Sequence, residues 1–206
     1  MSARRGFAIA CAASLAATLG DFAMLLVSTA GHFARSVEAP EALVWLGGAL
    51  GVICLPLHTL GYAAAARSVF AGAPIAARVT RIAGIAASLL GAVIHGLTAL
   101  AIQAQLEAGP GAAPAMAPLD AVALSPELVA LWSAAGLCAL AACGAITLCA
   151  ARGHNKWALA TPLALSLALA ALGSATELGK WLLLPAAPNL AHLGFFALGW
   201  SRTRGS

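Results

Sequence analysis

The sequence predicts an all-α fold, a polytopic transmembrane helical bundle of about six spans. The composition is the first observation behind this, because 62% of the 206 residues are hydrophobic, 9% are charged and the mean hydropathy is +0.93. The second is that the apolar residues form runs of about 20, the length of a membrane-crossing helix. The third is that most cations lie on one side of these runs. A soluble globular domain is excluded.

The apolar runs make residues 1–206 a single transmembrane domain. The expected spans cover residues 6–29, 42–66, 79–105, 126–151, 157–176 and 181–201. The boundary between the last two is the weakest, because only Glu177, Lys180, Pro185 and Pro188 interrupt the apolar sequence there. One long helix followed by a short re-entrant segment is the alternative for this region.

The charges predict the orientation. With the N-terminus inside, nine of the eleven cations lie on the cytoplasmic side: Arg4, Arg5, Arg67, Arg78, Arg81, Arg152, Lys156, Arg202 and Arg204. Five carboxylates lie on the outer side: Glu38, Glu41, Glu107, Asp120 and Glu127. The positive-inside rule therefore puts both termini in the cytoplasm of a multi-pass inner-membrane protein. Because the positive charge is explained by topology, it predicts no nucleic-acid partner.

The first run is apolar throughout except for one carboxylate, Asp21, about two thirds of the way along. An acidic side chain inside hydrocarbon costs roughly 2.5–3.5 kcal/mol on insertion scales, so it is kept mainly where it faces protein or water. A short apolar stretch ending at Cys11 superficially resembles a lipoprotein cleavage box. Because the run continues to Ser28, we expect an uncleaved first helix.

The second and third runs each carry one histidine, His58 and His95. Pro56 removes a backbone hydrogen bond just before His58 and is expected to bend the helix there. The short connection 71–74 should hold the two runs together as an antiparallel hairpin. The outer loop 107–125 is rich in Pro, Ala and Gly and is expected to be a flexible connector, with a lid as the alternative.

The last two runs add Glu177, Asn189 and His192. At about 1.5 Å per residue, Asp21, His95, Asn189 and His192 share the outer half of the membrane, and Glu177 lies at its outer rim. His58 is the exception and lies deeper. Small residues at three-and-four spacing on these helices are explained by close helix packing, but the ionisable groups are not.

No metal site and no cofactor is predicted. The five cysteines lie in apolar runs without a Cys-x-x-Cys pair, so we interpret them as packing residues. Haem ligation by His58, His95 or His192 ranks below the hypotheses that follow. A metal held by His95, His192 and Asp21 is chemically reasonable, but no ligand spacing in the sequence demands it.

Four short motifs resemble an uncharacterised family of small polytopic bacterial membrane proteins. They are Gly20-Asp21, Pro56-Leu57-His58-Thr59-Leu60-Gly61-Tyr62, Gly91-Ala92-Val93-Ile94-His95 and Pro188-Asn189-Leu190-Ala191-His192-Leu193-Gly194-Phe195-Phe196. The resemblance implies a multi-helix membrane fold and no established activity. There is also a similarity in style to membrane sterol isomerases and integral-membrane terpene cyclases, from which no residue is carried over.

Two hypotheses of different class follow. In the first, the protein is an enzyme that isomerises or cyclises a hydrophobic isoprenoid or lipid by acid/base chemistry, with Asp21, His95 and His192 as catalytic residues. The expected substrate contacts are Asn189, His58, Phe22, Phe195, Phe196 and Glu177, although for Glu177 an ion pair with Lys180 is the favoured structural role. In the second, it is a non-catalytic small transporter or a binding and scaffolding bundle with a structural polar network. The expected partners are membrane lipids and, for the enzyme, that substrate.

Overall fold

The computed structural model describes residues 1–28, 40–70, 72–108, 126–153 and 155–203, and this part of the chain is helical without a strand. The α-helices are α1 Ala3–Ser28, α2 Pro40–Cys54, α3 His58–Val69, α4 Pro74–Ala108, α6 Pro126–Arg152, α7 Pro162–Ser174 and α8 Glu177–Arg202. Two 3-10 turns join them, η1 Leu55–Leu57 and η2 Lys156–Leu159. The predicted all-α class is confirmed.

Four stretches are long and apolar enough to cross a membrane: Ala3–Met24, Glu41–Val69, Pro74–Ala104 and Val129–Arg152. They coincide with the first four expected spans. Their outward faces carry large apolar side chains, such as Leu19, Ile53 and Leu137, which are 55%, 67% and 67% exposed. Several polar side chains of the same stretches, such as Ser14, Asp21 and His95, are buried instead. This arrangement suits a lipid environment, where exposed apolar surface needs no protein partner.

The second span is broken in its middle. α2 ends at Cys54, the turn η1 contains Pro56, and α3 begins at His58. Proline lacks the N–H that an α-helix needs at this position, so the chain tightens into a 3-10 turn before the helix resumes. At Pro56, where a bend was expected, the structure has this 3-10 interruption of the helix. At the end of α3 the chain turns through Gly72, whose φ is +84°, and returns as α4.

The C-terminal region differs from the expected span 157–176. That stretch contains the turn η2 and then the 13-residue helix α7, about 20 Å long against a hydrocarbon core of about 30 Å. Thr161 caps α7 by accepting a hydrogen bond from the Ala164 N–H, and Pro162 occupies its first turn. Because of this cap and proline, the helix begins at Pro162 and not at the predicted residue 157. α8 follows with 26 residues, so the short helix precedes the long one. The alternative prediction, a long helix followed by a short re-entrant segment, has the opposite order.

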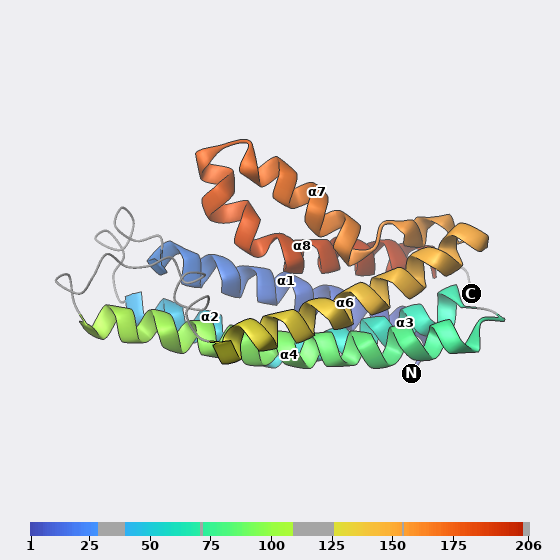
Figure 1. Ribbon diagram of the computed structural model, residues 1–206, viewed down its shortest axis with the longest axis horizontal. Coiled ribbons are helices and arrows are strands. Elements are labelled where there is room, and N and C mark those ends of the chain that lie inside the picture. The colour runs from blue at the N-terminus through green and yellow to red at the C-terminus, as the bar shows by residue number, and fades with distance from the viewer. Residues whose placement is uncertain (29–39, 71, 109–125, 154, 204–206) are drawn as a thin grey trace.

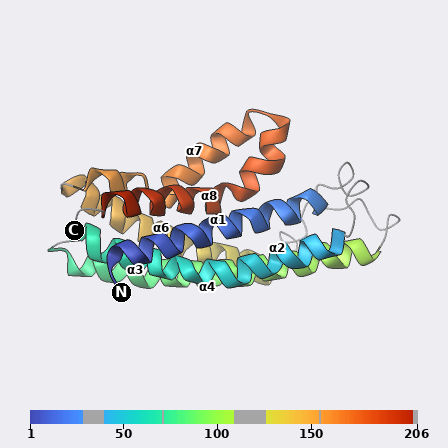
Figure 2. The same cartoon turned by 180° about the vertical axis from the view of Figure 1, so that it is seen from behind.

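The helices pack side by side in a fixed order (Figures 1 and 2). α1 lies between α8 on one side and α2 and α3 on the other, while α4 packs against α2 and α3, and α6 packs along α4. α7 slants away from this bundle and contacts α8, which bends before it runs back along α1 (Figure 1). Pro185 and Pro188 lie in the first half of α8 and account for the bend.

α1 carries the interior seam of the bundle. One row of its buried residues alternates at spacings of three and four: Phe7, Ala10, Ser14, Ala17, Asp21 and Met24. Such a repeat keeps one helix face against its neighbours. Phe7 and Ala10 belong to an apolar cluster with residues of α3, α6 and α8, and Met24 belongs to another with residues of α2 and α4. The polar residues of the seam therefore lie between two apolar clusters.

Charge is divided between the two ends of the bundle. The described basic side chains all lie at the end that holds both termini and the α3–α4 turn: Arg4, Arg5, Arg67, Arg78, Arg81, Arg152, Lys156 and Arg202. Glu41 lies in the first turn of α2, Glu107 near the end of α4 and Glu127 in the first turn of α6, all toward the opposite end. We expect the basic end to face the cytoplasm.

A reporter fused to the C-terminus tests this orientation. Green fluorescent protein after Ser206 should fluoresce, and alkaline phosphatase at the same position should be inactive, because it folds only outside the cytoplasm. The opposite pair of results would contradict the orientation. Exchanging Arg4 and Arg5 for Glu serves as the control, since it weakens the charge bias and should lower the fluorescent fraction.

Candidate functional site

Asp21 lies at the centre of a group of polar side chains from three helices, which we call the carboxylate centre. The Asn189 side-chain amide of α8 donates a hydrogen bond to Asp21 Oδ2 over 2.8 Å. His95 of α4 places Nδ1 3.5 Å from Asp21 Oδ1. The three residues are 9%, 7% and 7% exposed. The carboxyl group thus faces protein, and the helices α1, α4 and α8 meet at it.

Glycines of α2 hold the His95 ring in place. His95 Nε2 lies 3.1 Å from the Gly47 carbonyl oxygen. A Cβ on Gly51 would overlap the His95 ring, so the ring occupies the space that a side chain would take. α1 and α2 also approach closely here, because a Cβ on Gly20 would lie 2.8 Å from the Gly47 carbonyl oxygen. The broken second span therefore supplies both the wall and one hydrogen-bond acceptor of the site.

The hydrogen bonds define where a proton must lie in the carboxylate centre. A backbone carbonyl only accepts, so His95 Nε2 carries a hydrogen and donates it to Gly47. In neutral His95 the other nitrogen, Nδ1, then has a lone pair facing Asp21 Oδ1. An ionised Asp21 beside that lone pair would leave two acceptors facing each other. One proton between Oδ1 and Nδ1 removes the conflict, whichever atom holds it.

A second group, which we call the histidine centre, lies closer to the basic end of the bundle. The His58 ring of α3 stacks on the His192 ring of α8 with centroids 4.8 Å apart. Tyr62 Oη lies 2.8 Å from His192 Nε2, and His192 Nδ1 lies 2.7 Å from the Pro188 carbonyl oxygen. Because the carbonyl only accepts, Nδ1 donates to Pro188 and Tyr62 donates to Nε2.

Ser14 of α1 completes the histidine centre. Its hydroxyl donates to the Ala10 carbonyl over 2.9 Å and lies 2.9 Å from His58 Nε2. Since the hydroxyl hydrogen is directed to Ala10, His58 donates from Nε2. The depth of each residue can be counted from the end of its helix that lies at the basic end of the bundle. Ser14 is 11 residues from the start of α1 (14 − 3), and His58 is 11 from the end of α3 (69 − 58). His192 is 10 from the end of α8 (202 − 192). All three therefore lie at one depth, about 15–17 Å from the basic end.

The two centres lie next to each other along α1 and α8, and we call them together the polar network. Ser14 and Asp21 are two turns apart on the buried seam of α1, with Thr18 buried between them. Asn189 and His192 are one turn apart on α8. Each centre therefore receives one side chain from each of these two helices, so that a movement of α8 along α1 would change both.

Five of the predicted site residues lie in the two polar centres. Asp21, His95 and Asn189 lie together in the carboxylate centre. His192 and His58 lie together in the histidine centre, so the expectation that His58 stands apart from His192 is wrong. The expected depth of His192 came from counting residues inward from the outer end of the last span. Such a count does not allow for the bend in α8.

Two of the three predicted aromatic substrate contacts are fully buried in this structure. Phe195 and Phe196 are both 0% exposed. Phe195 packs on Trp157, and Phe196 meets the edges of the His58 and Tyr62 rings. Phe22 is half-buried on α1. The Glu177 side chain lies outside the described residues.

Ser14 and Tyr62 were not among the predicted site residues. Tyr62 follows His58 by four residues on α3, and Ser14 precedes Asp21 by seven on α1, so helical spacing alone puts each on the same face as a predicted residue. The role of the Gly47 carbonyl has no comparable signal, because a backbone acceptor is not marked by residue type.

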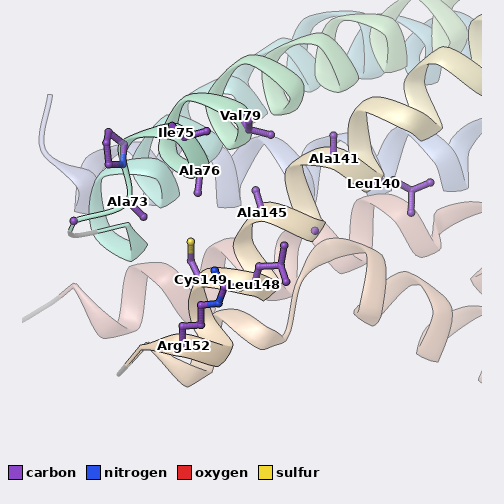
Figure 3. A pocket seen from close by; sticks show the side chains of 13 residues that line it. Ala73, Ile75, Ala76, Val79, Leu140, Ala141, Ala145, Leu148, Cys149 and Arg152 are labelled. Atoms are coloured by element: carbon purple, nitrogen blue, oxygen red, sulfur yellow. The ribbon is translucent and has the colours of Figure 1, made fainter.

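A pocket of about 680 Å³ lies elsewhere, between the first turns of α4 and the last turns of α6 (Figure 3). None of its lining residues belongs to the carboxylate centre or the histidine centre. The chain matches no protein-family model, no curated protein and no solved structure. The resemblance to a family of small bacterial membrane proteins stays a prediction.

The contact between Gly51 and His95 predicts the effect of one methyl group. Gly51→Ala should displace the His95 ring and lower the stability of the protein by about 1–3 kcal/mol, the usual cost of overpacking a core. Thermal unfolding in detergent measures this. Gly136→Ala is the matched control, because a Cβ at Gly136 on α6 meets nothing within 4 Å. Equal melting temperatures for the two variants would contradict the placement of His95.

Proposed function

We propose that the protein is a multi-pass inner-membrane proton carrier that binds one proton inside its helix bundle and releases it on the other side of the membrane. The single observation that carries this proposal is the carboxylate centre, where Asp21 Oδ1 and His95 Nδ1 face each other at 3.5 Å while His95 Nε2 is committed to Gly47. That arrangement is stable with one proton between the two atoms, and without it two hydrogen-bond acceptors face each other. Carboxylates and histidines buried inside membrane bundles typically mark proton relays.

The broken second span supports a carrier. Binding sites of secondary transporters are typically formed by discontinuous helices near the middle of the membrane. Here α2 contributes the Gly47 carbonyl to the carboxylate centre, and α3 contributes His58 and Tyr62 to the histidine centre. The break at η1 lies between these contributions. A change of angle at η1 would therefore alter both centres at once.

The filled hydrogen-bonding positions also favour proton transfer over direct catalysis in this conformation. Both Asp21 oxygens and both His95 nitrogens already face protein partners. In the histidine centre, the stacked His58 and His192 rings cannot both be charged without strong repulsion at 4.8 Å. Each centre thus accommodates a change of one proton.

Proton entry into vesicles tests the proposal. The protein is reconstituted into liposomes that contain the pH indicator pyranine, and a pH gradient is imposed. Valinomycin and potassium are present so that no membrane potential builds up against proton entry. Wild type should acidify the lumen faster than protein-free vesicles, and Asp21→Asn should abolish the difference. Gly136→Ala should behave as wild type. Equal rates for wild type and Asp21→Asn would contradict the proposal.

One observation favours the acid/base enzyme as a second candidate. His192 is only half-buried, whereas Tyr62 and His58 are each 1% exposed. A lipid beside α8 therefore has access to one member of the network, and an isomerase or cyclase would use His192, Asp21 and His95 to move protons on an isoprenoid chain.

Mass spectrometry of a native membrane lipid extract separates the two candidates. The enzyme predicts that wild-type protein converts a lipid of the extract to a product of the same mass and different retention time, and that His192→Phe and Asp21→Asn abolish the conversion. The carrier predicts an unchanged extract together with proton entry. Conversion that persists in both variants would contradict the assignment of these residues.

A further inference from the structure

The pocket between α4 and α6 is apolar along its length and basic at one end (Figure 3). Ala76 and Val79 of α4 face Ala141, Ala145 and Leu148 of α6 across it. Its volume of about 680 Å³ lies in the range of about 300–1,000 Å³ typical of sites for small molecules. A lining of this kind suits a hydrocarbon chain.

The floor of this groove is open because α6 presents a glycine to it. A Cβ on Gly144 would meet nothing within 4 Å, and the flanking Leu148 is 59% exposed. On the opposite wall Ile75 is 79% exposed. These side chains border the groove and leave its centre unfilled by the protein.

Two arginines mark the basic end. Arg152, the last residue of α6, lines the groove itself. Arg78 lines a smaller adjoining pocket that shares Pro74, Ile75 and Val79 with it. Both side chains are exposed. α4 begins at Pro74, so the positive end of its helix dipole adds to the charge here.

We propose that this groove holds one acyl chain of an anionic phospholipid, whose phosphate group is bound by Arg152 and Arg78. Basic pockets between transmembrane helices on the cytoplasmic side are suited to anionic headgroups. A zwitterionic lipid would fill the apolar groove equally well but would leave the positive charge unbalanced. The charge therefore selects the headgroup, and the groove selects a lipid over a soluble anion.

The bound lipid would brace α6, which the rest of the bundle holds along one side. Ala142, Ile146 and Ala150 of α6 pack into the same apolar cluster as Tyr62 and Phe196. The groove residues lie on another side of the helix. This inference does not depend on the proposed carrier function, because it uses none of the residues of the polar network.

Native mass spectrometry with a defined lipid mixture tests the site. The purified full-length protein is incubated with equal amounts of phosphatidylglycerol and phosphatidylcholine of identical chains, and the bound lipid is counted. Wild type should retain one phosphatidylglycerol. Arg78→Gln combined with Arg152→Gln should weaken its retention on the order of tenfold or more, toward that of phosphatidylcholine.

A pair of glycine variants tests the groove separately from the charge. Gly144→Leu should fill the groove and reduce retention of both lipids. Gly136→Leu is the matched control on the same helix, because Gly136 is equally open but does not line the groove, and it should bind as wild type.

The proposal is overturned if the double arginine variant retains phosphatidylglycerol as wild type does, or if wild type retains the two lipids equally. It is also overturned if the two glycine variants bind alike. Should Gly144→Leu fail to fold, the arginine variants still decide the outcome, since both arginine side chains are exposed and their exchange leaves the packing intact.

Discussion

The contact between Asp21 and His95 is the constraint on which the rest of the bundle depends. A carboxyl group within an apolar helix is costly unless protein surrounds it. Here the surroundings come from three helices: Asn189 from α8, His95 from α4 and the glycine face of α2. The α1–α2 crossing is close because Gly20 and Gly47 carry no side chains, and the same closeness brings the Gly47 carbonyl within reach of His95.

The polar network and the apolar clusters divide the length of the bundle between them. Toward the basic end, Phe7, Trp157 and Phe195 pack with Phe196, which also meets the histidine centre. Toward the other end, Met24 packs with Val44 and residues of α4. The polar groups between them satisfy one another, as buried polar groups in a membrane must. The result is an interior that is apolar toward both ends and carries titratable groups where α1, α3, α4 and α8 meet.

Much of the fold could be predicted from the sequence because the apolar runs are long and the charges lie at their ends. The last two helices were predicted less well. The 157–176 run is as apolar as the others, and only the Thr161-Pro162 cap shows that its helix starts late and stays short. At the site, depth along the helices brought Asp21, His95 and Asn189 together. It failed for His58 and His192, because His192 was counted inward from the outer end of the last span, whereas a count from the other end gives the two residues the same depth.

The most direct test of the central claim is the protonation of His95 in the folded protein. Nitrogen NMR of protein labelled in histidine, with His95→Gln to assign the signals, reports which ring nitrogen carries hydrogen. The geometry predicts a hydrogen on Nε2 and an Nδ1 signal that shifts in Asp21→Asn, while the Nε2 signal does not. A His95 ring with its hydrogen on Nδ1 alone, or with signals unaffected by Asp21→Asn, would contradict the shared proton.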